Sequence, residues 1–240
     1  MKKNDYFWVF IPARSGSKSI KNKNIKKICN VPLLAYSILA AKKLKFVNNI
    51  VVSSDSKKYL NIAKKYGCNL LHLRPKEFAK DKTSDLEVFK DYLNYLKKKN
   101  ITPPKLFVHL RPTAPQRSTK VLVKAINYFK KKSKNFSSMR SVSLMLNPSQ
   151  KTMHIINKKL CSVINKDFNL DKYNKPKELF KKTYLPNGYI DIVKTKNILN
   201  NILHGKKVLP FITKLNLDID SIEDYRYAKY KMEKIEKSKK

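Results

Sequence analysis

Glycine and cysteine are scarce in this chain of 240 residues, which contains four glycines and three cysteines. Neither of the glycine-rich nucleotide motifs, G-x-G-x-x-G and G-x-x-x-x-G-K-[ST], occurs, so the common dinucleotide loop and the P-loop are excluded. The cysteines, Cys29, Cys68 and Cys161, form no C-x-x-C pair and have no histidine at zinc spacing. We therefore expect reduced, partly buried thiols rather than a zinc site.

Long apolar runs are also missing. No segment approaches the ~20 apolar residues that span a bilayer, and the apolar stretch near the amino terminus is too short for a signal peptide. We expect a cytoplasmic protein without membrane insertion. A hydrophobic content of 42% argues against disorder, and the length suits a single domain covering residues 1–240.

Acidic residues are few, 17 against 54 lysines and arginines, which gives a net charge of +37. Such a charge is typical of nucleic-acid-binding proteins, which remain the alternative from a different class. Their basic residues should gather on one face or one helix, however, and these lysines are spread over nearly every segment. We interpret them as a general enrichment in lysine and expect no specific nucleic-acid partner.

Short apolar runs alternate with segments of helical period through the first two thirds of the chain. The predicted strands are Phe7–Ile11, Ile50–Ser53, Leu70–Leu73, Leu106–Leu110 and Val142–Met145, and the predicted helices are Leu33–Lys43, Lys57–Tyr66, Asp85–Lys97 and Thr119–Lys131. This alternation predicts right-handed βαβ units and an α/β fold with a mixed, mainly parallel sheet.

The alternation stops after Ser149. Residues 152–156 and 159–164 are typical of a hairpin that turns at Asn157-Lys158, and residues 150–183 are expected to form a protruding hairpin or arm. Two further strands, Gly188–Val193 and Val208–Ile212, precede a lysine-rich helix, Ile222–Ile235.

The loop after the first strand has the most informative sequence, IPARSGSKSIKNKN, from Ile11 to Asn24. A loop at the carboxyl end of an early strand is where open α/β sheets bind nucleotides. Its fixed cations and small hydrogen-bond donors are what a polyphosphate requires.

This loop resembles the signature of the sugar-acid cytidylyltransferases, which has the form I-P-A-R-x-G-S-K-x-x-x-x-K-N. Further segments match the family's motifs in the same order: VVSSDS from Val51, LRPKEFAKDKTS from Leu73, RPTAP from Arg111, PNG from Pro186 and LDIDS from Leu217. The family usually has glycine and proline where this chain has Ser19 and Lys21, and a positive φ at Ser19 would be strained.

The resemblance implies a Rossmann-like, three-layer nucleotidyltransferase fold. It also implies an enzyme that joins CMP from CTP to a 2-keto sugar acid, such as a sialic-acid-like nonulosonate, and releases pyrophosphate. The same chemistry on 3-deoxy-octulosonate or another sugar acid is the nearest alternative. The family also implies Mg²⁺ as cofactor and a homodimer in which residues 150–183 contact the partner.

The resemblance also assigns roles to residues. Those implied to bind the nucleotide are Ala13, Arg14, Ser17, Lys18, Lys23, Asn24, Asp55, Arg74 and Ser84. Those implied to bind the sugar are Arg111, Thr113, Asn187 and Gly188. The implied metal ligands are Asp218 and Asp220, and Arg14, Lys23 and Asp220 are implied to act in catalysis.

Four of these positions, Asp55, Asp218, Asp220 and Arg111, need separate comment. Asp55, directly after a strand, is by itself more typical of a helix cap than of a nucleotide contact. Asp218 and Asp220 could cap the last helix, although paired carboxylates in so basic a chain favour a divalent cation. Arg111 stands where the family has glutamine, and Leu185 where it often has arginine. We predict that Arg111 compensates by pairing with the sugar's carboxylate.

Overall fold

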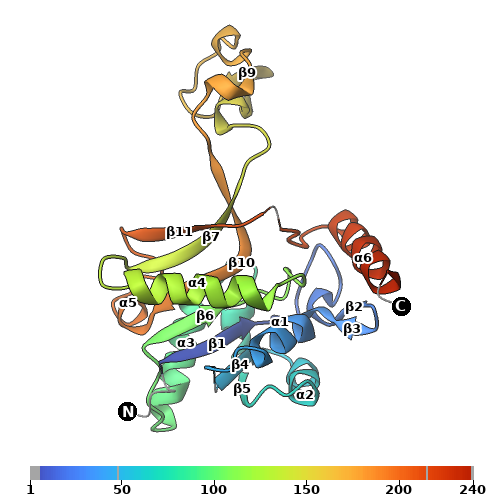
Figure 1. Ribbon diagram of the computed structural model, residues 1–240, viewed down its shortest axis with the longest axis vertical. Coiled ribbons are helices and arrows are strands. Elements are labelled where there is room, and N and C mark those ends of the chain that lie inside the picture. The colour runs from blue at the N-terminus through green and yellow to red at the C-terminus, as the bar shows by residue number, and fades with distance from the viewer. Residues whose placement is uncertain (1–5, 48, 215, 239–240) are drawn as a thin grey trace.

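The computed structural model describes residues 6–47, 49–214 and 216–238. Seven strands form one sheet in the order β11-β7-β10-β6-β1-β4-β5 (Figure 1). Their bounds are β1 Phe7–Pro12, β4 Asn49–Ser54, β5 Leu70–Leu73, β6 Leu106–His109, β7 Ser138–Leu144, β10 Tyr184–Lys194 and β11 Val208–Ile212. Only β10 pairs antiparallel with its neighbours in this sheet, so the sheet is mixed and mainly parallel, as predicted.

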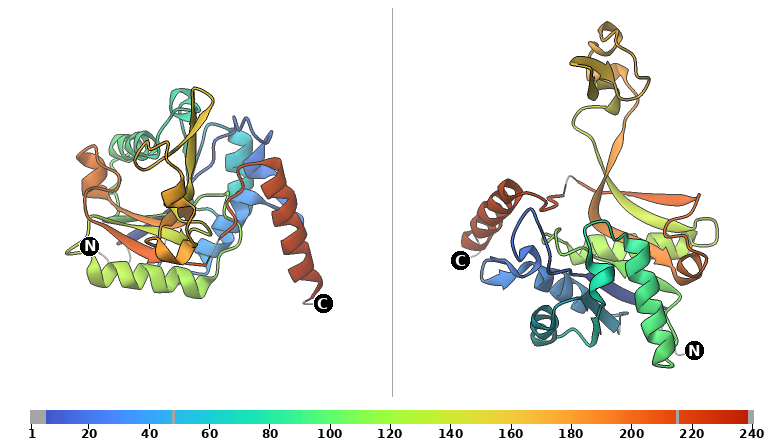
Figure 2. Two further views of the ribbon diagram at one scale, coloured as in Figure 1. Left: turned by 90° about the horizontal axis from the view of Figure 1, so that it is seen from above. Right: turned by 180° about the vertical axis from the view of Figure 1, so that it is seen from behind.

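Helices cover both faces of the sheet and make three layers (Figure 2). They are α1 Leu33–Lys42, α2 Lys57–Lys65, α3 Asp85–Lys98, α4 Thr119–Lys132, α5 Thr195–Leu199 and α6 Ile222–Lys237. The alternation of side chains along β1 explains the two cores. Val9 and Ile11 pack with α1, α2 and α4, whereas Trp8 and Phe10 pack with α3 and α5 on the opposite face.

The predicted strands and helices are largely confirmed, and two strands begin four residues earlier than predicted. β7 begins at Ser138, four residues before the predicted Val142, because its first half alternates small polar residues with Met139 and Arg140 and has no apolar run. β10 begins at Tyr184, four residues before the predicted Gly188, and contains Asn187 and Gly188. The pairing of β10 with β7 shifts register there, and Gly188 has a φ of 63°.

Several short elements gave no sequence signal. The hairpin of β2 Lys27–Ile28 and β3 Val31–Pro32 and the helix α5 were not predicted. Nor were the 3₁₀ turns Lys23–Ile25, Lys76–Ala79, Ser149–Lys151, Asp171–Tyr173 and Lys177–Leu179.

The segment between β7 and β10 stands away from the sheet in Figure 1 and in the right panel of Figure 2. It contains the expected hairpin, formed by β8 Met153–Ile156 and β9 Lys159–Ser162. Asn157 and Lys158 turn the chain with φ values of 49° and 62°. Two successive left-handed residues are what a tight two-residue hairpin loop requires.

The carboxyl-terminal segment returns to the amino-terminal loop. Ala228 of α6 and Ile219 pack in one apolar cluster with Ile20 of the loop and with Ile28. The hydroxyl of Tyr225 donates to the carbonyl of Lys27 at 2.6 Å. The two ends of the chain thereby lie against each other. Within the described ranges, no helix has the length and hydrophobicity to span a membrane.

Candidate functional site

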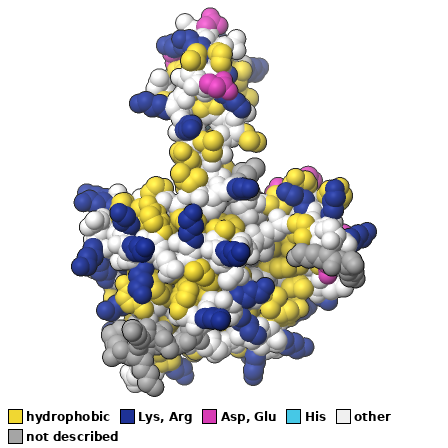
Figure 3. Space-filling view, in the orientation of Figure 1, with side chains coloured by type: hydrophobic (Ala, Val, Ile, Leu, Met, Phe, Trp, Pro, Cys, Tyr) yellow, Lys and Arg dark blue, Asp and Glu magenta, His cyan; other side chains and the backbone are white. Residues whose placement is uncertain are grey.

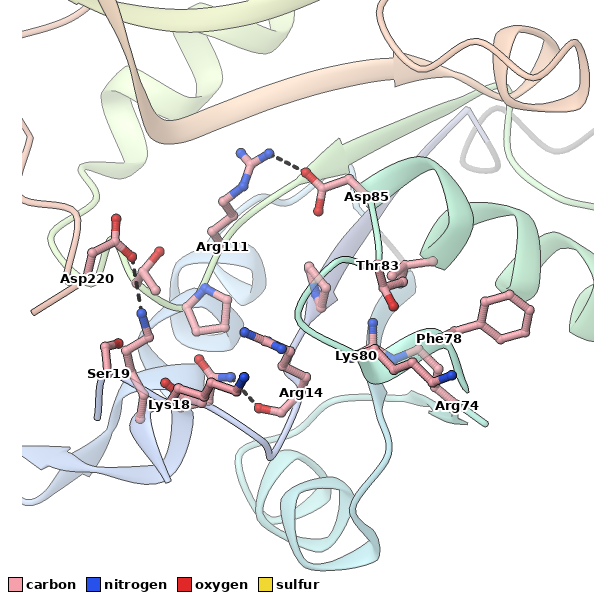
Figure 4. Close-up of a pocket in the computed structure, with 17 residues that line it drawn as sticks. Arg14, Lys18, Ser19, Arg74, Phe78, Lys80, Thr83, Asp85, Arg111 and Asp220 are labelled. Atoms are coloured by element: carbon pink, nitrogen blue, oxygen red, sulfur yellow. Dashed lines mark hydrogen bonds and ion pairs between the residues drawn. The ribbon is translucent and has the colours of Figure 1, made fainter. Parts of the chain in front are cut away.

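A cavity of about 510 Å³ opens at the carboxyl ends of the central strands (Figure 4). Four separate parts of the sequence line it: the loop after β1, the segment between β5 and α3, the corner after β6, and the segment before α6. The lining residues are Pro12, Arg14, Ser17, Lys18, Ser19, Lys23, Asn24, Arg74, Phe78, Lys80, Thr83, Asp85, Val88, Arg111, Pro112, Thr113 and Asp220.

The loop after β1 is fixed from beneath by polar side chains. The carboxylate of Asp55 accepts hydrogen bonds from the amide and the hydroxyl of Ser15, at 2.8 and 2.6 Å. The Asn24 side chain donates to the Arg14 carbonyl at 2.9 Å, and the amide of the buried Ala13 donates to the Ser53 carbonyl at 2.9 Å. These contacts support a loop whose cationic side chains project into the cavity.

Asp55 is therefore not a helix cap, and that interpretation was wrong. Ser56 is the N-cap of α2, and its side chain accepts from the amide of Tyr59. The expected strain at Ser19 is also absent, because Ser19 has no positive φ. Asn22 takes the left-handed conformation instead, with φ of 56°, and asparagine adopts it more readily than most residues.

Two cations of the loop share one carboxylate across the cavity. Arg14 and Lys18 each approach Asp81 at 2.6 Å. The hydrogen bonds from Lys18 and then Arg14 lower the pKa of Asp81 below its ordinary value. Because Asp81 is exposed, an incoming polyanion can displace it from both cations without the cost of leaving a buried charge unpaired.

Lys23 joins the two ends of the chain. Its ammonium donates to the carbonyl of Ile219 at 2.9 Å and approaches Asp220 at 3.2 Å. One cavity is thus lined by Arg14, Lys18, Lys23 and Asp220, although 197 positions of the sequence separate Lys23 from Asp220.

Asp218 lies next to Asp220 in the same segment. Its side chain hydrogen-bonds to Thr113, and burial, followed by the charge of Asp220, raises its pKa. Its Oδ1 is buried and has no hydrogen-bond partner among the described residues. An unpartnered oxygen beside a second carboxylate fits a divalent cation. Two carboxylates are too few to hold such an ion alone, and no cluster of three or more His, Cys, Asp or Glu side chains occurs in the described ranges.

Arg74 is buried at the end of β5 and lines the cavity. Its Nε and one terminal nitrogen have no hydrogen-bond partner among the described residues, and burial lowers its pKa. A buried guanidinium with free donors is costly unless a ligand satisfies it. The position therefore fits a bound anion or a carbonyl-bearing base.

Ser84, which the resemblance implies to bind the nucleotide, is not among the residues that line the cavity. It is the N-cap of α3 and forms a capping box with Glu87, and its hydroxyl lies 2.7 Å from that carboxylate. Thr83, Lys80 and Phe78 from the same segment line the cavity instead. The sequence gave no signal for these three, because nothing in their spacing distinguishes them from ordinary loop residues.

Arg111 has two carboxylate partners of its own. Its terminal nitrogens lie 2.6 Å from Asp85 and 2.8 Å from the buried Asp191. Although burial opposes it, the charges of Asp85 and Asp191 raise the pKa of Arg111. Neither acid was identified from the sequence, since Asp85 was taken as the start of a helix and Asp191 as part of a strand.

Asn187 and Gly188 lie behind the cavity and do not line it. Asn187 donates to the Thr213 hydroxyl at 2.7 Å, and a side chain at Gly188 would come within 2.8 Å of Asp218. Gly188 also offers its carbonyl to Arg117 at 3.0 Å. These contacts support Asp218 and the corner after β6.

Comparisons with known proteins agree with this geometry. A family model described as cytidylyltransferase matches residues 8–223. The N-acylneuraminate cytidylyltransferase of Escherichia coli is 34% identical over 221 residues, covering 91% of this chain and 50% of that protein. The CMP-N,N'-diacetyllegionaminic acid synthase of Legionella pneumophila is 28% identical over 236 residues, covering 93% and 94%.

A solved structure of CMP:2-keto-3-deoxy-manno-octonic acid synthetase complexed with CTP superposes with a TM-score of 0.68. It is 12% identical and covers 95% of this chain and 99% of its own. At that identity the likeness concerns the fold alone. The chain spans about half the length of the Escherichia coli relative that it matches.

Proposed function

Because the chain belongs to the cytidylyltransferase family, we propose that it joins CMP from CTP to a 2-keto sugar acid of the nonulosonate type and releases pyrophosphate. One observation carries the proposal. The cations Arg14, Lys18 and Lys23, from the amino-terminal loop, and Asp220, from near the carboxyl terminus, line a single cavity at the carboxyl edge of the sheet.

The cationic side of the cavity fits a triphosphate. Within the described part of the chain, the Arg14 and Lys18 side chains pair with the exposed Asp81 alone, so they can turn to phosphate oxygens when CTP enters. Lys23 is half-buried and anchored on the Ile219 carbonyl, which keeps its charge beside Asp220. Preorganised cations of this kind stabilise the charge that develops as pyrophosphate separates.

The reaction joins the two substrates in one displacement. The anomeric hydroxyl oxygen of the sugar acid bonds to the α-phosphorus of CTP, the bond from that phosphorus to the pyrophosphate oxygen breaks, and the hydroxyl proton is released. Holding both substrates in one cavity supplies the proximity and orientation on which such a step depends.

Asp220 lines the cavity; Asp218 does not line it, but its buried Oδ1 has no partner among the described residues, which supports a magnesium ion held by both carboxylates together with phosphate oxygens. When bound, the ion would neutralise negative charge on the phosphates. Lys23, which contacts Asp220, would keep that carboxylate turned toward the cavity.

The arm supports the further proposal of a homodimer. Large apolar side chains on it are widely exposed, among them Leu146, Ile155 and Leu179, which are 72–77% accessible. Exposed apolar residues gathered on one segment are typical of a protein–protein contact. Sedimentation at micromolar concentration would test this, and a clean monomer would contradict it.

The alternative of a nucleic-acid binder finds no support on the face drawn in Figure 3. Lysine and arginine side chains are scattered over that face and do not form a continuous stripe. A nucleic-acid footprint should form a stripe or a patch.

Pyrophosphate release tests the proposal directly. The purified protein should release pyrophosphate with CTP, Mg²⁺ and a sialic-acid-like keto acid, and much less with UTP, GTP or ATP. A parallel panel containing legionaminate-type, pseudaminate-type and octulosonate-type acids would identify the sugar. Absence of release with every acid would reject the proposal.

A further inference from the structure

The groups around the cavity fall into two halves according to the strands that they follow. The groups suited to the nucleotide follow β1, β4 and β5: the cationic loop, its support Asp55, and the buried Arg74. Arg111 follows β6, and its partner Asp191 lies on β10, so both belong to the other half. Since β1 lies between these halves, where the strand order reverses, the second substrate should contact the β6–β10 half.

A charged triad forms the wall of that half. Its third member, Asp85, comes from α3, which follows β5 but packs against Phe107 of β6 and so brings Asp85 to Arg111. Arg111 binds Asp85 with one terminal nitrogen and Asp191 with the other, at 2.6 and 2.8 Å. The Asp191 side chain is 1% exposed and lies beneath the wall. The Asp85 side chain is 35% exposed, and both Asp85 and Arg111 line the cavity (Figure 4).

This arrangement leaves Arg111 poorly suited to bind another carboxylate. Both of its terminal nitrogens are already engaged by acids. Arg140, whose Nε lies 3.8 Å from Asp191, balances the buried acid, but Asp85 lines the cavity and would repel an incoming carboxylate. Asp85 itself has acceptor capacity left. Only its Oδ2 is hydrogen-bonded, to Arg111, and no donor to its Oδ1 is found in the described part of the chain.

Asp85 is ionised at neutral pH. Burial alone would raise its pKa, but the charges of His109 in acid and of Arg111 outweigh burial and bring the pKa to about 2. The start of α3 also favours a negative charge. A fixed carboxylate with a free oxygen accepts hydrogen bonds from hydroxyl and amide groups.

We propose that Asp85 determines sugar specificity by accepting a hydrogen bond from a hydroxyl or acylamino N–H of the sugar acid. Arg111 then acts as a positioning residue that holds Asp85, and it does not bind the sugar's carboxylate. The inference rests on the proposed function of the same site and names the part of the substrate that this wall recognises.

The Asp85→Asn variant separates the two possible roles of Arg111 by the sign of its effect. If Asp85 accepts a bond from the sugar, the variant should raise the KM for the sugar acid about tenfold and leave the KM for CTP within twofold. If Arg111 binds the sugar's carboxylate, removing the competing acid should lower the KM for the sugar acid. That second result would overturn the proposal.

Glu87→Gln is the matched control. Glu87 lies in the same first turn of α3, is exposed and does not line the cavity. The Glu87→Gln variant removes the same negative charge as Asp85→Asn, so it shows how much of the change in KM comes only from charge at the start of α3. The control should leave the KM of the sugar acid unchanged. A rise equal to that of Asp85→Asn would overturn the proposal.

Substrate analogues show whether the effect comes from a direct contact. A series of sugar acids, each lacking one hydroxyl or the acylamino group, is measured with the wild type and with Asp85→Asn. For the analogue that lacks the recognised group, the two proteins should have equal kcat/KM, because the contact is already lost. Additive losses for every analogue would show a merely structural role and overturn the proposal.

The outcome also distinguishes this inference from the proposed function. Wild-type turnover with CTP and a sugar acid, combined with an unchanged KM in Asp85→Asn, would reject the role of Asp85 alone. A wild type that turns over no sugar acid would reject the proposed function and the inference together. Thermal unfolding of each variant, with a melting temperature near that of the wild type, confirms that the comparison is between folded proteins.

Discussion

Lys23 and Asp220 are separated by 197 positions in the sequence and form an ion pair of 3.2 Å. The side chain of Lys23 is 12% exposed and that of Asp220 is 78% exposed, so the cation is anchored and the carboxylate reaches into the cavity. The pair joins the amino-terminal loop to the segment before α6, and both residues should matter more for activity than for stability.

Asp220→Ala should abolish turnover and leave the fold intact. Because the side chain is mostly exposed, its loss costs little stability, whereas the divalent cation would lose one of its two protein ligands. We expect kcat to fall by about 100-fold or more. Steady-state pyrophosphate release over a range of Mg²⁺ concentrations measures the loss, with thermal unfolding beside it.

Glu223→Ala serves as the control for Asp220→Ala. Glu223 is an exposed acid in the first turn of α6 and does not line the cavity. Its removal should leave kcat unchanged. Full activity of Asp220→Ala at ordinary Mg²⁺ would reject the metal assignment.

Lys23→Met should reduce kcat/KM for CTP by about 100-fold, as removal of one preorganised donor to a developing anion typically does. The apolar stem is kept, so the packing around Ile219 should survive. Lys21→Met, in the same loop but exposed and outside the cavity, is the matched control. Equal kinetics of the two variants would show that total charge, and not the position of Lys23, attracts the nucleotide.

The sequence predicted the central sheet and the cationic loop well because both depend on local signals. Apolar runs identify β1, β4, β6 and β11, and the run of cations from Arg14 to Lys23 identifies the loop. The site residues that sequence reasoning missed depend on long-range packing. Asp85 and Asp191 are ordinary in their own segments and gain importance only where α3 and β10 bring them to Arg111.

Ser84 illustrates the opposite case, a residue that a sequence motif assigns to the site and that does not line the cavity. Its position in a motif indicated a ligand contact, but local capping geometry with Glu87 determines where its hydroxyl points. A capping box is a local signature, so the sequence alone predicts the helix cap at Ser84.

Variants at the neighbouring residues Asp55 and Ser56 should have different effects, because Asp55 supports the loop after β1 and Ser56 caps α2. Asp55→Asn weakens the two hydrogen bonds that fix Ser15, and we expect the KM for CTP to rise about tenfold. Ser56→Ala removes the cap of α2, should lower stability by about 1 kcal/mol, and should leave the KM unchanged. Kinetics and urea unfolding of both variants test this, and a reversed pattern would show that Asp55 is only structural.

Arg117→Lys should destabilise the protein strongly although it keeps the charge. The Arg117 guanidinium donates to the carbonyls of Tyr189, Arg111, Gly188 and Ala114 and to the Ser37 hydroxyl. Lysine cannot reproduce this planar fork, and unsatisfied buried carbonyls cost about 1–3 kcal/mol each. We expect a loss of roughly 3 kcal/mol in the free energy of unfolding.

Denaturant unfolding of Arg117→Lys and of Arg226→Lys provides the comparison. Arg226 is exposed on α6, and its replacement should change stability by less than about 0.5 kcal/mol. A similar small change for Arg117→Lys would mean that the corner after β6 does not depend on this side chain.

The buried His109 should make the protein sensitive to mild acid. Burial, followed by the charge of Arg111, lowers its pKa from 6.5 to about 4. Between these values the unfolded chain binds a proton that the folded chain does not, so stability falls as pH drops through this range. The loss from this one residue between pH 7 and pH 5 should be about 2 kcal/mol. His72, whose pKa is also lowered to about 4, adds to it.

His109→Phe tests this prediction most directly. The ring lies against Phe10 and Phe89, and neither ring nitrogen has a hydrogen-bond partner among the described residues. An apolar ring therefore fits the same space without leaving a polar group unpaired. The variant should lose less stability than the wild type between pH 7 and pH 5, by about 2 kcal/mol. The raised pKa values of Asp91 and Asp218 make the folded state more stable as pH falls, but this contribution is the same in the wild type and in His109→Phe. Replacement of the exposed His154 should leave the pH dependence unchanged, and an equal slope in His109→Phe and the wild type would show that His109 does not titrate as inferred.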